Sequence, residues 1–371
     1  MKRLLLLGGG HAHVHVLRAL ARQRLPGTEV MLVTPFLRQM YSGMVPGLVA
    51  GHYAADDCAI PLAPLAHAAG VSLVEASAVA MDADARVVRL STGQQAEYEL
   101  LSIDTGSVMA RDMLPGAAEH ALFVRPIEHF VQLFERTVLL AAQRALDVVV
   151  IGGGAAGVEL AMALQRRLGV QARVALVLGG TTPLEGYSVE VVAAAMANLR
   201  RWRIALLPET CASIAADHVL LASGARLACD VPVLAAGSSA PLWLQGSGLA
   251  LDERGYISTT ATLQSSSHAQ VLAVGDVASR IDMAHPRSGV YAVRAGPPLA
   301  HNLRALLAGA PTQAHQPSPR TLNLISCGDR RAIASWGNWT AQGRWVWWWK
   351  DHIDRDFVRR YSLPENHRAV A

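Results

Sequence analysis

The chain has 371 residues, of which 51% are hydrophobic and only 17% are charged, a composition that excludes an intrinsically disordered protein. This length accommodates two or three domains with buried cores. The net charge is +4 at pH 7, and the basic residues are dispersed until the last segment of the chain, so we expect no nucleic-acid partner.

An apolar chain raises the question of a membrane span, and no stretch of the sequence is typical of one. The longest uncharged run, residues 231–251, contains three glycines and two prolines, whereas a spanning helix needs about 20 continuous apolar residues. The N-terminal run of leucines resembles a signal peptide, but it ends at three glycines without a cleavage site of small residues. We therefore expect a cytoplasmic protein that begins with a β-strand.

The first predicted unit lies at the N-terminus. An apolar strand over residues 4–7 leads into a glycine turn at residues 8–10, a helical pattern to about residue 24, and a second apolar strand over residues 29–33. This order is a βαβ unit of a parallel sheet. His13 stands where a dinucleotide-binding turn has its third glycine. We therefore expect either a slightly wider gap between helix and strand or an imidazole that points away.

Histidine and cysteine give weak signals for metal binding. His11 and His15 share one helical face, but no Cys, Asp or Glu nearby completes a coordination sphere, so we expect no metal. The four cysteines have neither zinc-site nor redox-pair spacing. We expect buried thiols in a reducing compartment, although Cys58 and Cys327 could meet in space.

A second βαβ unit follows in the middle of the chain. A strand over residues 148–151 leads into the pattern Gly152-x-Gly154-x-x-Gly157, a helix to about residue 168, and a strand over residues 172–178. The three glycines permit a tight turn, close approach of a pyrophosphate, and close packing of helix on strand. Two such units predict an α/β fold with two Rossmann-like dinucleotide-binding domains.

The acidic residue that holds a ribose hydroxyl at the end of the second strand is missing from both units. Thr34 occupies that place in the first unit, and Leu178 and Gly179 occupy it in the second. The sequence therefore does not choose between NADH and NADPH.

Several further segments resemble a known family. Together with the two glycine turns, they are similar to the two-dinucleotide-binding-domain flavoproteins of the pyridine nucleotide-disulfide oxidoreductase superfamily, to about residue 310. The closer likeness is to the type II NADH dehydrogenase-like branch, especially the flavoprotein fused to selenide, water dikinase. The segments that carry the superfamily likeness are 103–107, 233–237 and 271–276; those that carry the closer likeness are 9–14, 41–47, 292–294 and 345–360.

The resemblance implies FAD on the first unit, NAD(P)H on the second, and a hydride that passes from nicotinamide to flavin N5 before electrons reach a quinone or other external acceptor. It also implies that the NAD(P)-binding domain is inserted into the FAD-binding domain. The expected boundaries are 1–112 and 238–310 for the two parts of the FAD-binding domain, 113–237 for the NAD(P)-binding domain, and 311–371 for a C-terminal Trp-rich region.

The resemblance also assigns cofactor contacts. In this reading the Asp276 carboxylate accepts hydrogen bonds from the ribitol hydroxyls, although a simple Gly-Asp turn is the alternative, and Val79 contacts adenine through its backbone. The expected cofactor-binding residues are Gly8, Gly9, Gly10, His11, Ala12, Thr34, Arg38, Ser42, Gly43, Met44, Val79, Thr105, Gly106, Gly152, Gly154, Ala155, Ala156, Gly157, Gly237, Gly275, Asp276, Tyr291 and Ala292.

Two residues are candidates for catalysis. Glu159 matches the glutamate that lies near nicotinamide and flavin in the type II dehydrogenases; the alternative is a first-turn acid stabilised by the helix dipole. Where those enzymes carry two glutamines on the quinone side, this chain has Val290 and Arg294. We expect Arg294 to favour a more anionic acceptor or the reduced flavin.

Two other functions stay open from the sequence. A sulfide- or selenide-oxidising flavoprotein would need Cys58 or Cys327. A flavin-binding partner protein without turnover is suggested by His13 and by the missing ribose acids. Disulfide reductases are disfavoured, because they need two neighbouring thiols at the flavin and this chain lacks that spacing.

The C-terminal region is rich in tryptophan, with six of the eight tryptophans between Trp336 and Trp349. A helix over residues 345–361 would place Lys350, Arg355 and Arg359 on the surface, away from an apolar stripe. We expect this stripe to dock on the flavin domain or form a dimer, or else to rest peripherally on the inner face of a membrane. The stripe comprises Val346, Trp349, Ile353, Phe357 and Tyr361.

Overall fold

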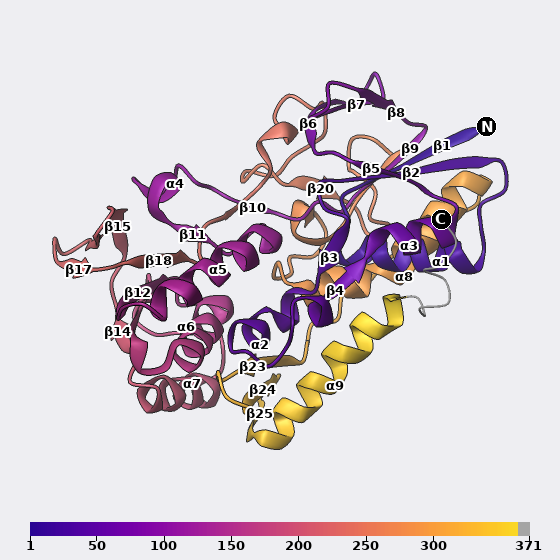
Figure 1. Cartoon of the computed structure of the whole chain (residues 1–371). Helices are drawn as coiled ribbons and strands as arrows, with labels where there is room; N and C mark the ends of the chain where they lie inside the picture. The colour runs from indigo at the N-terminus through magenta and orange to yellow at the C-terminus, as the bar shows by residue number, and fades with distance from the viewer. Residues whose placement is uncertain (363–371) are drawn as a thin grey trace.

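The computed structural model describes residues 1–362 and contains two five-stranded parallel sheets, one in each half of the molecule (Figure 1). The predicted α/β fold of two Rossmann-like units is therefore confirmed. The first sheet has the order β21-β9-β1-β2-β5. Its edge strand β21 therefore comes from a much later part of the chain than the other four strands. Its strands are β1 (Lys2–Leu7), β2 (Thr28–Thr34), β5 (Ser72–Glu75), β9 (Leu100–Ile103) and β21 (Val271–Ala273).

The first sheet is buried on both faces, which explains the unbroken leucine run of β1. Leu4 and Leu6 pack into the core shared with the helices, whereas Leu5 and Leu7 pack on the opposite face under a small antiparallel sheet. Alternate side chains of one strand thus fill two cores. The helices on the first face are α1 (His11–Arg22), α3 (Leu62–Ala69) and α8 (Gly289–Ala308), and the antiparallel strands are β6 (Ala78–Asp82), β7 (Val87–Leu90) and β8 (Gln95–Glu97).

The second sheet repeats this plan with the order β11-β18-β12-β13-β14. Its strands are β11 (Leu122–Phe123), β12 (Leu146–Ile151), β13 (Ala172–Val177), β14 (Ala205–Leu207) and β18 (Val231–Leu234). The elements packed around it are α5 (Ile127–Ala141), α6 (Ala155–Leu168), α7 (Val189–Arg201), β15 (Cys211–Ile214), β16 (His218–Leu221) and β17 (Arg226–Ala228).

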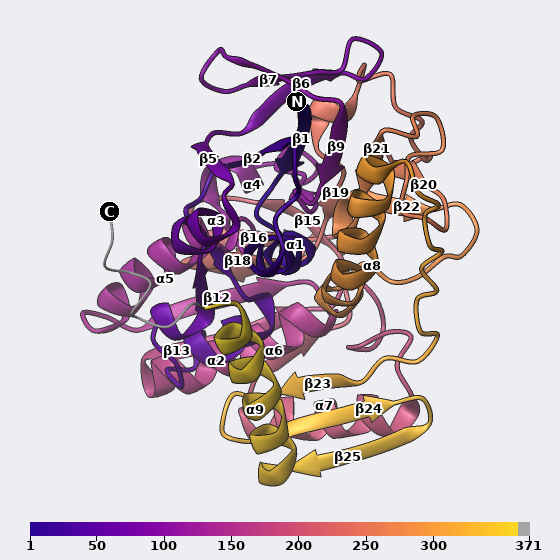
Figure 2. The same ribbon diagram turned by 90° about the vertical axis from the view of Figure 1, so that its right-hand side faces the viewer.

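The C-terminal region forms a unit that joins both halves. Strands β23 (Asn323–Ser326), β24 (Ala332–Trp336) and β25 (Trp339–Gly343) lie beside α7, and α9 (Arg344–Tyr361) runs from them along the first half (Figure 2). On one side, Trp202 Nε1 after α7 donates a hydrogen bond of 2.7 Å to the Cys327 carbonyl. On the other, Phe357 stacks on Tyr41 with ring centroids 4.4 Å apart. The unit therefore fixes one half against the other.

The predicted C-terminal helix is confirmed, but its predicted apolar stripe is wrong in part. Trp349 and Ile353 are 38% and 37% exposed. Trp347, Lys350 and Asp354 are buried in their place, so Lys350 does not lie on the surface as predicted. The reason is that Lys350 and Asp354, one turn apart, form a buried ion pair, which an apolar periodicity does not reveal.

The remaining elements connect the two halves or close their edges. Within residues 1–362, no helix is long and apolar enough to cross a membrane. These elements are β3 (Arg38–Met40), α2 (Val45–Val49), β4 (Ala59–Pro61), β10 (Val108–Met109), α4 (Ala117–His120), β19 (Ser238–Ser239), β20 (Ile257–Thr259) and β22 (Ala278–Arg280).

Candidate functional site

The first glycine turn is closed by the end of a neighbouring strand. A Cβ on Gly8, whose φ is +94°, would lie 2.5 Å from the Asp104 carbonyl oxygen, and a Cβ on Gly10 would lie 2.4 Å from the Asp104 carboxyl carbon. Only glycine fits at either position. In the described chain, no protein group accepts a hydrogen bond from the N–H groups of Gly10 and His11. These N–H groups at the start of α1 suit a pyrophosphate.

His13 fills the space that a third glycine would leave open. The imidazole is fully buried, and its Nδ1 lies 2.6 Å from the Gly8 carbonyl oxygen. Because a carbonyl only accepts, Nδ1 donates this bond, and Nε2 accepts from the Ser102 hydroxyl at 2.8 Å. Burial lowers the pKa of His13 to about 4, which keeps the ring neutral. The expectation of an imidazole that points away is therefore wrong.

Asp104 was not singled out from the sequence. Its Oδ2 accepts hydrogen bonds from the N–H groups of Ala12 (2.8 Å) and His13 (2.9 Å), so it caps α1 from the adjacent strand end. Burial raises the pKa of this carboxyl to about 7. The sequence did contain a signal for this role. Asp104 directly follows the apolar strand β9, and the carboxyl ends of parallel strands lie at the same edge of a sheet as the glycine turn.

The residues that follow the edge strand β21 of the first sheet form a second wall of the site. Asp276, just after β21, pairs with Arg125 at 2.8 Å, and Arg125 also donates to the Ser107 hydroxyl at 2.7 Å. A Cβ on Gly289, the first residue of α8, would lie 3.1 Å from the Ser42 hydroxyl. The fold thus brings Ser42, Asp276 and the start of α8 to one region, although these segments are far apart in the sequence.

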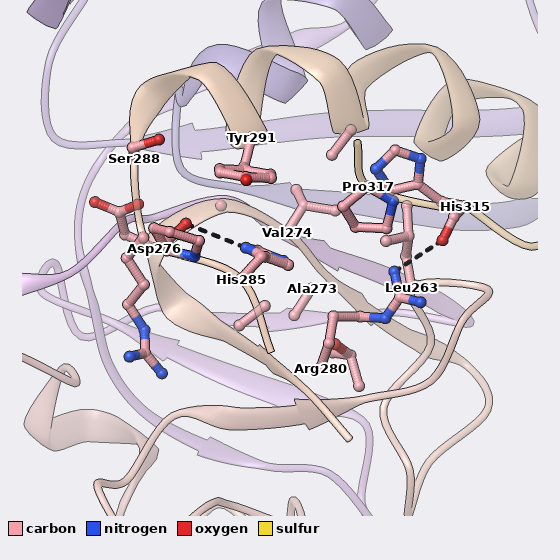
Figure 3. A pocket seen from close by; sticks show the side chains of 16 residues that line it. Leu263, Ala273, Val274, Asp276, Arg280, His285, Ser288, Tyr291, His315 and Pro317 are labelled. Atoms are coloured by element: carbon pink, nitrogen blue, oxygen red, sulfur yellow. Dashed lines mark hydrogen bonds between the residues drawn. The ribbon is translucent and has the colours of Figure 1, made fainter. Parts of the chain in front are cut away.

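A small pocket opens beside this wall (Figure 3). Asp276, Ser288 and Tyr291 line one part of it, and His285 stacks on the Tyr291 ring with centroids 4.6 Å apart. Arg280 donates a hydrogen bond of 3.0 Å to the His315 carbonyl at its other end.

The residues of the first half fit FAD. The two free N–H groups suit its pyrophosphate, and the Asp276 carboxylate suits its ribitol hydroxyls. Gln39 adds a further position: its side-chain oxygen is buried without a hydrogen-bond partner among residues 1–362, while its amide nitrogen lies 3.4 Å from the His11 ring. A buried acceptor without a donor suits a donor group from a bound molecule.

The other expected FAD contacts are more dispersed. Thr34 is buried, with its hydroxyl 3.2 Å from the position of a Cβ on Gly9. Arg38 pairs with the exposed Asp56 at 3.4 Å, and Val79 is 45% exposed on β6. Ala12, Met44 and Ala292 are buried, whereas Thr105, which follows Asp104, is exposed. Gly43 lies in the turn Ser42–Met44, Gly106 follows Thr105, and Gly275 precedes Asp276.

The second glycine turn is tighter than the first. A Cβ on Gly157 would lie 1.8 Å from the Gly152 carbonyl oxygen, so helix α6 packs directly on the turn. Among the described residues, no atom lies within 4 Å of the position of a Cβ on Gly154, which leaves the backbone open to a ligand. Ala155 and Ala156 begin α6, and Gly237, with φ of +81°, follows β18. This geometry suits the pyrophosphate of NAD(P)H.

A cluster of charged side chains lies where helix α6, the C-terminal unit and the Ser42–Met44 turn meet. Glu159 Oε1, on the first turns of α6, accepts a hydrogen bond of 2.7 Å from the Ser326 N–H. Lys350 Nζ donates 2.6 Å bonds both to the Gly43 carbonyl and to Asp354 Oδ2. Glu159 and Lys350 thus connect the NAD(P) helix, the C-terminal unit and the Ser42–Met44 turn.

The charges of this cluster influence each other. Desolvation raises the pKa of Glu159 to about 7, and the Lys350 cation limits that rise. Burial alone would lower the pKa of Lys350, but Asp354 and Glu159 outweigh it and hold this pKa above its usual value. Glu159 therefore exchanges a proton near neutral pH while Lys350 stays charged. Arg294, the other catalytic candidate, is exposed on α8.

The four cysteines are not joined by disulfides. All four are free and buried. Burial raises the pKa of Cys58 and of Cys327 to about 12, so neither is a thiolate at neutral pH. This disfavours the sulfide- or selenide-oxidising alternative.

Comparisons with known proteins identify the family of the chain. Residues 2–299 match the family profile described as pyridine nucleotide-disulphide oxidoreductase. An NADH dehydrogenase-like protein of Mycobacterium tuberculosis is 31% identical over 303 residues, covering 77% of this chain and 75% of that protein. A demethylphylloquinone reductase of Synechocystis is 25% identical, covering 76% and 72%.

Solved structures share the fold. A sulfide:quinone oxidoreductase of Aquifex aeolicus superposes with a TM-score of 0.80 at 17% identity, covering 98% of this chain and 92% of that one. NDH2 of Plasmodium falciparum in complex with NADH gives 0.78 at 12% identity, covering 98% and 99%. The chain belongs to the pyridine nucleotide-disulphide oxidoreductase family and is an NADH dehydrogenase-like oxidoreductase that uses FAD and NAD(P)H.

Proposed function

We propose that this flavoprotein passes electrons from NAD(P)H to a quinone-type acceptor. The observation that carries the proposal is the position of Glu159 and Lys350 between the NAD(P) helix α6 and the Ser42–Met44 turn. When bound, FAD supplies the redox chemistry by accepting a hydride and releasing two electrons. The name of the Synechocystis relative, a demethylphylloquinone reductase, supports an acceptor of this class.

The chemistry of quinone reduction requires a proton that the hydride does not supply. NAD(P)H and one proton convert a quinone to a quinol and NAD(P)+. Glu159 holds that proton on its carboxyl group, because its pKa of about 7 keeps it partly protonated at neutral pH. Ser326 orients the carboxyl through Oε1, and Lys350 stabilises the carboxylate after the proton has left.

The test is an anaerobic titration of the purified, FAD-loaded protein. We expect NADH or NADPH to bleach the flavin absorbance and a short-chain naphthoquinone to restore it within the turnover time. A flavin that neither nucleotide bleaches would support the partner-protein alternative. A reduced flavin that naphthoquinone reoxidises no faster than buffer alone would exclude the quinone.

We also propose that the C-terminal unit rests on a membrane surface. Its outward face, here called the tryptophan surface, carries five side chains that are 38–63% exposed. Trp345 stands between Trp339 and Trp349 at centroid distances of 6.4 and 6.5 Å. Tryptophan is favoured at the membrane interface. The members are Trp336, Trp339, Trp345, Trp348 and Trp349.

Flotation with vesicles of phosphatidylethanolamine and phosphatidylglycerol tests this placement. We expect the full chain to float, and the triple variant W345S/W348S/W349S to lose at least about nine-tenths of the floating fraction because interfacial apolar area is removed. The matched control changes three exposed apolar residues of the half built on the second sheet, Leu139, Val170 and Val189, to serine and should float normally. If wild type stays at the bottom and sediments as a dimer that the triple variant dissociates, the surface binds a second copy instead.

A further inference from the structure

The NAD(P) turn has no acid where Rossmann domains place one. Strand β13 ends at Val177, and Leu178, Gly179 and Gly180 follow. An acid at this point binds the ribose 2′-hydroxyl of NADH, whereas a nearby arginine accommodates the 2′-phosphate of NADPH. Residues 178–188 contain neither lysine nor arginine. The strand end alone therefore does not explain nucleotide selection.

The loop after this strand end folds back onto the glycine turn. The Leu184 N–H donates a hydrogen bond of 2.8 Å to the Gly153 carbonyl, and the Leu184 side chain is fully buried. Tyr187 then donates its N–H to the Leu184 carbonyl at 3.0 Å. Ser188 caps α7 by accepting the Val191 N–H at 3.4 Å. The loop is thus held at both ends beside the nucleotide turn.

This arrangement brings a carboxylate to the strand end from elsewhere in the loop. Glu185 Oε2 lies 3.3 Å from the position that a Cβ on Gly180 would occupy. In the described part of the chain, the Glu185 carboxylate makes no hydrogen bond or ion pair with protein. Gly180 has no side chain to separate this carboxylate from the backbone that follows β13.

A second acid nearby serves as a structural comparison. Glu209 follows β14, and its backbone carbonyl accepts the Gly179 N–H at 2.9 Å. Its carboxylate turns away, however, and accepts the Ser223 N–H at 3.3 Å. Of these two acids, Glu185 therefore has the carboxylate that lies beside the backbone after β13.

We infer that Glu185 replaces the missing strand-end acid and makes this site select NADH over NADPH. Its carboxylate accepts hydrogen bonds from the ribose hydroxyls and repels a 2′-phosphate. The inference rests on the nucleotide role of the second half and deepens the proposed function by naming its reductant.

The experiment measures binding of ADP-ribose and of 2′-phospho-ADP-ribose to the FAD-loaded protein by calorimetry. We expect wild type to bind ADP-ribose about tenfold or more tightly than the phosphorylated form. Glu185→Gln should reduce this ratio about tenfold, because it removes the charge and keeps the shape. Glu209→Gln, the matched control, should leave the ratio unchanged.

Two results would overturn the inference: tighter binding of the phosphorylated form by wild type, or an equal change of the ratio in both variants. Neither measurement depends on flavin reduction. A flavin that NADH does not bleach, with the ratio still shifted by Glu185→Gln, would therefore reject the proposed function and leave this inference standing. Failure of both ligands to bind wild type would reject the nucleotide site itself and the inference with it.

Discussion

Replacing Lys350 with methionine is expected to lower the free energy of unfolding by about 3–5 kcal/mol, because it leaves a buried carboxylate without its partner. Lys350 and Asp354 are 8% and 4% exposed, and their charged atoms are 2.6 Å apart. The substitution also removes the donor to the Gly43 carbonyl, so the Ser42–Met44 turn should loosen. Urea unfolding of the FAD-loaded protein, followed by circular dichroism and flavin fluorescence, measures both effects.

Two further variants isolate the buried pair. Arg360 and Asp356 form an ion pair of 2.8 Å with the same spacing on the same helix, but both side chains are about half exposed. Arg360→Met should therefore cost less than about 1 kcal/mol. The double variant K350M/D354L should recover part of the loss, since it removes the unpaired charge. Equal costs for Lys350→Met and Arg360→Met would contradict a structural role of the buried pair.

Glu159→Gln is expected to slow reoxidation of the reduced protein by a quinone about a hundredfold at pH 7, because glutamine cannot supply the proton. In wild type this rate should fall as the pH rises through about 7, where Glu159 loses its proton. The variant should lack this pH dependence. Stopped-flow mixing with naphthoquinone between pH 5.5 and 8.5 measures both properties, and Glu190→Gln on the exposed first turn of α7 serves as the control.

The same substitution should change stability in a pH-dependent manner that is separate from activity. The folded pKa of Glu159 is raised above its ordinary value of 4.5, so folding is favoured by protonation. Stability that is fully present below pH 4.5 is lost as the pH rises through about 7. Glutamine stays neutral, so the melting temperature of the variant should rise relative to that of wild type as the pH increases over this range. If the rate of reoxidation by naphthoquinone depends on pH in Glu159→Gln as it does in wild type, another group supplies the proton.

Much of the fold was predictable because local patterns determine it. The leucine run of β1 and the valine run of β12 are continuous, as strands buried on both faces require, and each leads into glycines that a close backbone demands. Glu159 was singled out because, two positions after Gly157 on the helix that follows the glycine turn, it matches the glutamate of the type II dehydrogenases that the sequence resembles. Such features depend on neighbours in the sequence.

The rest of the site depends on contacts between distant segments. Lys350 was expected on the surface because charged residues on amphipathic helices normally are, and only the fold places it against Gly43, 307 residues away. Asp104 looked like one residue of a family segment, and its capping role arises because β9 lies beside β1. The exposure of Trp349 has the same origin, since the ion pair rotates the buried face of α9.

The replacement of a glycine by His13 has a consequence for attempts to recombine the two halves. His13, Ser102 and Asp104 interlock in the first half, whereas the matching places of the second half hold Gly157, Val233 and Ala235. Transferring one residue of either set alone into the other half would leave a buried polar group without a partner or create a clash. The two halves therefore share a backbone plan but close it with different side chains, so a chimera of the two halves must exchange each set of three residues as a whole.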